Sequence, residues 1–223
     1  MILDKNGKPI ERLKKKTIKI NDVKVKGEIH PYGGFVALTA RVYGNARVSG
    51  NARVSGDAWV YGDARVSGDA FVYGDALVYN NAQVYGYARV SGNARVFGDA
   101  LVYDNAWVSG DALVYGNTQV YGYAQVSGNA FVYGNTRVYG YAQVSGNARV
   151  SGNTQTTTLV LNVITFPYSI TLTDNHIQIG CEQISIKAWQ KHGRAIAKKY
   201  KMPTKQQTAY KKIIEGLLTL RRI

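Results

Sequence analysis

Valine recurs at every sixth residue from Val36 to Val150, twenty times in succession, and alanine nearly always stands two residues before it. The repeating unit is A-x-V-[S/Y]-G-[N/D]. A period of six fits neither a helix nor a long strand, whereas a fixed short period is typical of a solenoid whose coils stack on one another. Ala and Val lie two residues apart, so both face one side of a short strand and x faces the solvent. The repeat therefore predicts short strands with Ala and Val inside and turns at Gly-Asn or Gly-Asp.

Departures from this unit indicate that three hexads form one coil. Threonine replaces alanine at positions 118, 136 and 154, and tyrosine replaces Asn or Asp at positions 87, 123 and 141, so both sets are spaced by multiples of eighteen. The aromatic residues that follow valine in one column repeat the spacing; they are Tyr43, Tyr61, Tyr79, Phe97, Tyr115 and Tyr133. Six residues cannot enclose a core, whereas three hexads can close a three-sided coil. We expect about seven stacked coils with two end edges that need a cover.

Coils of eighteen residues with an aliphatic residue every six resemble the hexapeptide-repeat superfamily, and the resemblance spans residues 34–156. It implies an all-β solenoid, a left-handed parallel β-helix of triangular section, and makes a trimer plausible. Those families usually place glycine directly after the aliphatic residue, but here Ser or Tyr takes that place and glycine follows one residue later. We therefore expect the same fold with slightly different corners.

The segments that flank the repeat change in character. The chain divides into a basic N-terminal β cap (1–33), the repeat (34–156), a cap of β-strands (157–183) and a basic helical C-terminal segment (184–223). Within them we predict a hairpin over 17–29, two or three strands over 159–180, and helices over 185–200 and 205–222. The C-terminal segment also resembles a module of uncharacterised phage and prophage proteins, which implies a mobile-element origin.

The net charge of +14 belongs to the two ends of the chain. Residues 36–155 carry eight Lys or Arg against seven acidic residues, whereas residues 156–223 carry eleven against three. The N-terminal residues lack the apolar run of a secretory signal, no stretch is long and apolar enough to span a membrane, and the single Cys181 has no partner for an internal disulfide. We expect no membrane contact and a cytoplasmic location, in a bacterial host if the protein is phage-encoded.

The sequence holds few groups for catalysis. Acyltransferases and zinc enzymes of the hexapeptide-repeat superfamily need imidazole on or beside the helix, but all three histidines lie outside the repeat. We therefore predict no catalytic residue and no cofactor, with an acyltransferase-like protein as one alternative. His176, Cys181 and His192 are candidate metal ligands, although their spacing matches no zinc motif and a buried Cys beside a hydrogen-bonded His is the commoner arrangement.

The outward positions of the coils differ among the three sides of the rod. The first face combines the aromatic column with the x residues Arg41, Trp59, Leu77, Arg95, Leu113, Phe131 and Arg149. The second face carries Arg and Gln beside Tyr85, Tyr103, Tyr121 and Tyr139. The third face is mostly Arg, Gln and Ser, with Phe71, Tyr73 and Trp107 as exceptions. The first face is therefore apolar through most of its length, up to the last coil, where Arg149 and Ser151 replace Phe131 and Tyr133.

An aromatic stripe of this size predicts an interface. Its residues are Tyr43, Trp59, Tyr61, Leu77, Tyr79, Phe97, Leu113, Tyr115, Phe131 and Tyr133. The C-terminal helices, the same face of other subunits, or a foreign protein could cover it. The alternative is that the rings only stack on one another and stiffen the rod.

The leading hypothesis is a non-enzymatic structural or interaction protein, either a homo-oligomer (trimer or dimer) or the binder of a protein partner. An alternative is nucleic-acid binding by the basic C-terminal segment. The same cations would also be explained by a helix face that is simply exposed to solvent. The contacts would come from Lys187, Lys191, Arg194, Lys198, Lys199, Lys201, Lys205, Lys211 and Lys212.

Overall fold

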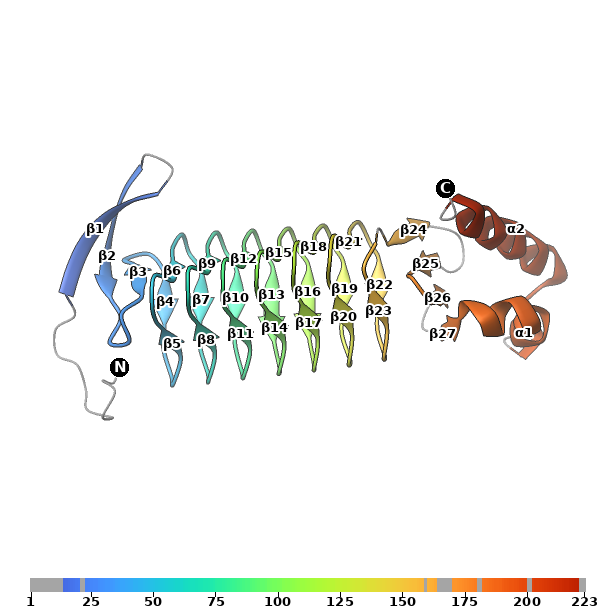
Figure 1. Ribbon diagram of the computed structural model, residues 1–223, viewed down its shortest axis with the longest axis horizontal. Helices are drawn as coiled ribbons and strands as arrows, with labels where there is room; N and C mark the ends of the chain where they lie inside the picture. The colour runs from blue at the N-terminus through green and yellow to red at the C-terminus, as the bar shows by residue number, and fades with distance from the viewer. Residues whose placement is uncertain are drawn as a thin grey trace.

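The computed structural model describes residues 14–20, 23–158, 160–163, 170–179, 182–199 and 202–220. Figure 1 shows a straight rod of stacked coils with a β-hairpin at its N-terminal end and two helices at its C-terminal end. The parallel β-solenoid predicted from the repeat is confirmed, with about seven turns of eighteen residues.

Each side of the rod is a sheet in which a strand pairs in parallel with the strand one coil later, as Leu77 pairs with Arg95. The first face consists of β4 (Arg41–Val42), β7 (Trp59–Val60), β10 (Leu77–Val78), β13 (Arg95–Phe97), β16 (Leu113–Tyr115), β19 (Phe131–Val132) and β22 (Arg149–Val150). The second face consists of β5 (Arg47–Val48), β8 (Arg65–Val66), β11 (Gln83–Val84), β14 (Leu101–Val102), β17 (Gln119–Val120), β20 (Arg137–Val138) and β23 (Gln155–Thr156). The third face consists of β3 (Phe35–Ala37), β6 (Arg53–Val54), β9 (Phe71–Val72), β12 (Arg89–Val90), β15 (Trp107–Val108), β18 (Gln125–Val126) and β21 (Gln143–Val144). The three columns of the sequence are thus the three sheets.

The interior contains the alanine and valine of each hexad, and most of these side chains are completely buried. Thr118, Thr136 and Thr154 take alanine positions and are also completely buried. Each of these hydroxyls donates to the backbone carbonyl three residues earlier, at 2.6–2.7 Å. A buried hydroxyl without a partner would cost about 1–3 kcal/mol, so this local bond is what lets threonine replace alanine in so narrow a core.

The corners bring neighbouring coils into close contact. Gly56 has a φ of 66°, and its Cα lies so near the backbone of Gly74 in the next coil that a Cβ would have no room. Asn and Asp side chains at the corners also bond from coil to coil, for example Asn45 Nδ2 to Asp63 Oδ1 at 3.0 Å. The recurrent acids therefore serve as hydrogen-bond acceptors along the rod. Among the described residues no three His, Cys, Asp or Glu gather as metal ligands.

The N-terminal edge is covered by the predicted hairpin, which begins slightly earlier than expected. Strand β1 (Lys14–Ile20) pairs antiparallel with β2 (Val23–Ile29), and β2 pairs antiparallel with β3. The described lysine side chains of both strands are exposed. Lysines along an outer strand oppose pairing with another sheet edge, so the hairpin ends the solenoid and discourages its extension.

A second small sheet covers the C-terminal end. Its strands are β24 (Leu161–Val163), β25 (Ile170–Leu172), β26 (His176–Ile179) and β27 (Glu182–Ser185). Asp174 ties this sheet to the last coil, because its carboxylate accepts bonds from the Thr157 amide at 2.6 Å and from the hydroxyls of Thr157 and Thr158 at 2.7 and 2.6 Å. The Ser151 hydroxyl is buried and donates to Gln178 at 3.3 Å. The change from Tyr133 to Ser151 therefore makes room for this cap.

Two helices follow, α1 (Ile186–Lys199) and α2 (Thr204–Leu220), as predicted. Their apolar side chains Trp189, Tyr210, Ile214 and Leu217 pack with Ile170, Leu172 and Ile177 of the small sheet. The hypothesis that these helices lie along the first face is wrong, because their apolar stripe is already used at the end of the rod (Figure 1). In the described part of the chain, neither helix has the length and apolarity that crossing a bilayer requires.

Candidate functional site

The aromatic column of the first face forms a continuous stack. Adjacent rings from Tyr43 to Tyr133 have centroids 4.8–5.2 Å apart and planes within 6° of one another. Stacking leaves these rings half-buried, apart from the more exposed Tyr43 at the open end. Burial raises the pKa of the Tyr61, Tyr79 and Tyr115 hydroxyls above the ordinary value. The stacked rings thus bury part of one another's apolar surface. The stack also holds the ring edges in a fixed row.

The outward x column of the first face lies beside this ladder. Trp59, Leu77, Leu113 and Phe131 are half-buried, and the arginines between and beyond them are exposed. The guanidinium of Arg41 lies over the Trp59 ring at 4.8 Å from its centroid, and that of Arg149 lies over Phe131 at 5.4 Å. All ten predicted interface residues therefore come together on one sheet, with a cation over the aromatic ring at either end.

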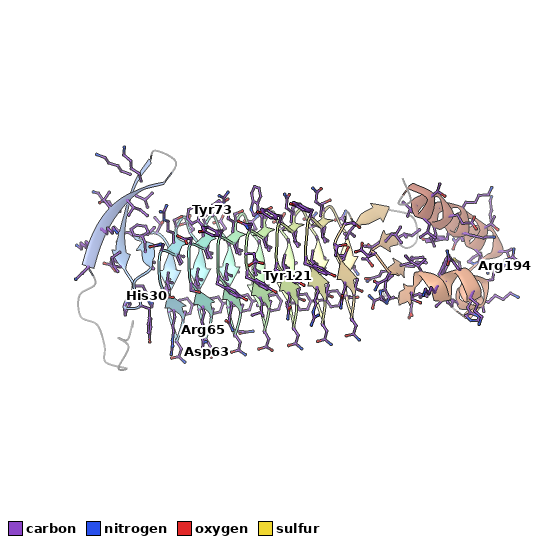
Figure 2. The ribbon with its side chains drawn as sticks, viewed as in Figure 1. His30, Asp63, Arg65, Tyr73, Tyr121 and Arg194 are labelled. Carbon is purple, nitrogen blue, oxygen red and sulfur yellow. The ribbon has the colours of Figure 1, made fainter. Side chains whose placement is uncertain are left out.

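A shorter ladder runs along the second face. Its rings Tyr85, Tyr103, Tyr121 and Tyr139 stack with centroids 4.8–5.1 Å apart, and Figure 2 shows Tyr121 on the body of the rod. These side chains are half-buried. The column beside them is mostly Arg and Gln, so this face offers no continuous apolar patch.

The most exposed rings lie elsewhere, along the corner between the second and third faces. Tyr87, Tyr123 and Tyr141 are 64%, 56% and 76% exposed, and Trp107 on the adjoining third face is 39% exposed. They line one groove of about 480 Å³ that crosses four consecutive coils. Large exposed apolar side chains that gather in one place mark binding sites. This groove is therefore a second candidate site, beside the predicted interface.

The rest of the groove is polar. Its other lining residues are Arg89, Asn105, Gln125 and Gln143. The Trp107 Nε1 donates to the Ser91 hydroxyl at 3.1 Å, and the Tyr123 and Tyr141 rings stack at 5.3 Å. Asn105 occupies the corner position at which the coil before carries Tyr87 and the coil after carries Tyr123. The sequence shows these tyrosines as periodic substitutions of a corner residue and Trp107 as an exception on its face, but it does not show that they form one groove.

Two of the three candidate metal ligands lie in the described part of the chain, and there neither belongs to a group of three or more His, Cys, Asp or Glu residues that could hold a metal ion. His176 is half-buried, its Nδ1 lies 2.7 Å from Asn175 Oδ1, and burial lowers its pKa. His192 is exposed on α1, and Cys181 lies outside the described residues.

The basic side chains of the two helices point to solvent. Lys187, Lys191, Arg194 and Lys198 of α1 are all exposed, as are Lys205, Lys211 and Lys212 of α2. Figure 2 shows Arg194 at the C-terminal end of the molecule. The spacing of the α1 cations places them on one side of that helix. Lys201 and the side chain of Lys199 lie outside the described part of the chain.

The match to a family of repeats agrees with the coil geometry. The YdcK β-solenoid repeat matches at residues 40–56, 46–62, 70–86, 88–104, 106–122, 124–140 and 142–156. A solved structure that resembles part of the chain is the acetyltransferase domain of PglB from Neisseria gonorrhoeae in complex with acetyl coenzyme A, at 16% identity and a TM-score of 0.26; the match covers 55% of this chain and 53% of that one. None of the curated proteins matches the chain. The repeat, its register and its core lead to one conclusion, that the chain belongs to a β-solenoid repeat family.

Proposed function

We propose that the protein is a non-enzymatic structural and interaction protein of the cytoplasm, a rigid rod whose first face pairs with the same face of a second copy. The observation that carries the proposal is the order of side chains in the outward column of that face. From Arg41 to Arg149 it reads Arg, aromatic, Leu, Arg, Leu, aromatic, Arg, and this order is the same in both directions. In a two-fold interface each residue faces its symmetry mate, so this column would place apolar residues against apolar residues and exposed arginines against arginines.

The symmetric column specifies how two rods would meet. In an antiparallel pair with its axis at Arg95, Leu77 of one copy faces Leu113 of the other, and Trp59 faces Phe131. The strands on which these residues lie are evenly spaced, so all such contacts form at once. The helices of this chain pack on the small sheet and leave the first face open for a second copy.

Opposite charges at the facing leucine positions test both the assembly and its direction. We expect the Leu77→Glu variant alone and the Leu113→Arg variant alone to be monomers, because each removes an apolar contact and places a charged group against leucine of the second copy. A mixture of the two variants should dimerise again, since the introduced carboxylate of one variant then faces the introduced guanidinium of the other. Light scattering after gel filtration would measure the masses. Gln83→Glu on the second face is the control and should leave the wild-type mass unchanged.

Two results would contradict this proposal. A wild-type protein that stays monomeric at high micromolar concentration has no such interface. If both variants are monomeric but the mixture fails to dimerise, the antiparallel register is wrong.

A second candidate function, nucleic-acid binding, is favoured by the exposed cations of α1 and α2. Within the described residues one ion pair is present, between Lys211 and Glu215 at 3.6 Å, so most of these cations have no acidic partner. A protein that neutralises phosphates loses affinity steeply as salt rises.

Replacing Lys187, Lys191 and Lys198 by glutamine should weaken binding of a single-stranded or duplex oligonucleotide and reduce the salt dependence by about three phosphate contacts. Fluorescence anisotropy at several salt concentrations would measure both effects. These helical positions are exposed, so the variant should remain folded. Absence of binding by the wild-type protein at low salt would reject this function.

A further inference from the structure

We propose that the groove on the third face binds a neutral, extended, β-linked oligosaccharide that lies along the rod. This site is separate from the first face, so it remains open when two rods pair there. The groove combines four exposed rings with three amide side chains.

The lining suits a ligand that is apolar on one side and carries hydroxyls at its edges. The negative face of an aromatic ring attracts the weakly positive C–H groups of a pyranose, and Trp107 is the largest ring in the groove. Tyr123 and Tyr141 stack on each other, so they offer the groove their edges and hydroxyls. Each amide can both donate and accept, which matches hydroxyl groups that do the same. Asn105, Gln125 and Gln143 supply these amides within the groove. Ligand sites commonly combine a few such polar groups with an apolar lining.

The spacing of the groove selects an extended chain. Its floor is one outward column, in which Arg89, Trp107, Gln125 and Gln143 follow one another at one side chain per coil. Neighbouring coils of such a sheet stack about 4.8 Å apart, and the Tyr123 and Tyr141 rings lie 5.3 Å apart. An extended β-linked pyranose chain advances by a similar length with each sugar. Successive sugars of a β-1,4-linked chain, which turn over at each linkage, can therefore follow successive coils at one sugar per coil, whereas a coiled α-linked chain cannot.

The charge of the lining argues against a polyanion. Arg89 is the one charged residue in the groove lining, and the repeat as a whole is nearly neutral. Surfaces that bind single-stranded nucleic acids pair their stacking rings with many cations along the backbone. The amides of this groove instead match an uncharged ligand.

The groove is held in place before any ligand arrives. The indole of Trp107 is tied to the preceding coil through Ser91, and the backbone amides of Tyr87 and Tyr123 bond to the next coil at 2.7 and 2.8 Å. Binding therefore requires little ordering of the backbone or of Trp107, which favours affinity for a flexible sugar chain.

Isothermal titration of the full chain with cellohexaose, chitohexaose and maltohexaose tests the proposal. We expect cellohexaose or chitohexaose to bind, and the preference between them identifies glucose or N-acetylglucosamine as the unit. Maltohexaose, which is α-linked, should bind at least about tenfold more weakly. Absence of binding by both β-linked probes at millimolar concentration would overturn the proposal, and so would equal binding of maltohexaose.

Three variants locate the site. Trp107→Gln should weaken binding of the preferred probe by about tenfold or more, and it should fold because the next two coils carry glutamine at this position. Leu101→Gln on the second face is the matched control, since the coils before and after carry glutamine at this position, and it should bind like the wild type. Gln125→Leu should also weaken sugar binding through loss of the amide.

The variants also separate a sugar site from other uses of the groove. Stronger probe binding by Gln125→Leu, or unchanged binding by Trp107→Gln, would overturn the proposal. Binding of oligothymidylate that Trp107→Gln abolishes, without binding of either β-linked probe, would assign the groove to nucleic acid instead.

Discussion

Replacing Gly56 by alanine should destabilise the rod by roughly 3 kcal/mol or more, far beyond the usual effect of one added methyl group. The φ of Gly56 is 66°, in the left-handed region, which costs an L-residue about 1–2 kcal/mol. The new Cβ would also lie 2.8 Å from the amide nitrogen and 2.9 Å from the carbonyl oxygen of Gly74. These are backbone atoms held by the ladder on either side, so they cannot move away without separating two coils.

Gly146→Ala provides a matched control. Gly146 has nearly the same φ of 64°, but no atom lies within 4 Å of the position that its Cβ would take. This variant should lose only the conformational term of about 1–2 kcal/mol. Urea unfolding followed by circular dichroism would measure the midpoints of both variants. Equal losses for the two would show that the backbone angle, and not the contact between coils, determines the need for glycine at these corners.

The repeat itself could be predicted from the sequence because each hexad makes its contacts with the equivalent hexad one coil away. The valines report the period, and the replacements at Thr118, Thr136 and Thr154 report the coil length. Once three hexads are assigned to a coil, the parallel register follows, since side chains alternate along a strand. No long-range contact has to be guessed in such a fold.

The position of the C-terminal helices could not be predicted in this way, because their contacts do not repeat along the chain. Tyr210, Ile214 and Leu217 identify an apolar stripe on α2, but the sequence contains two apolar surfaces that could receive it. The helices pack on the small sheet, where Ile170, Leu172 and Ile177 form one buried cluster with them, whereas the first-face rings already stack on one another. Whether the helices pack on the small sheet or on the first face depends on how far each surface is already buried. A periodic sequence pattern does not indicate this.

The groove of the third face shows a similar limit. The sequence identifies Tyr87, Tyr123 and Tyr141 by their spacing in multiples of eighteen, and Trp107 as an aromatic exception in a mostly polar column. That all four meet depends on the corner turning between two faces, and on Asn105 leaving space in the tyrosine column. Exposure, rather than residue type, distinguishes these rings from the half-buried ladders, and exposure follows only from packing.

His30 illustrates a residue whose role the sequence does not reveal. It lies just before the first coil, near the N-terminal end of the rod (Figure 2), and is 3% exposed. Its ring is 5.6 Å from that of Tyr32, and its Nδ1 lies 3.5 Å from the backbone nitrogen of Val48. Burial lowers the pKa of His30 to about 4. The imidazole is therefore neutral in the folded rod at ordinary pH.

Acidification should consequently weaken the N-terminal coil. Unfolded histidine takes up a proton near pH 6.5, whereas folded His30 does so only near pH 4, so between these values the unfolded state binds more protons. Stability falls as pH decreases through this window, by roughly 3 kcal/mol at most. Hydrogen exchange at the amides of Gly34 and Phe35, which bond to Val48 and Ala52, would report this locally. The His30→Gln variant lacks the titrating group and should show a much smaller loss between pH 7 and pH 4.5. An equal loss in the variant would mean that other groups destabilise the coil in acid, because glutamine can accept the same backbone bond but cannot be protonated in this range.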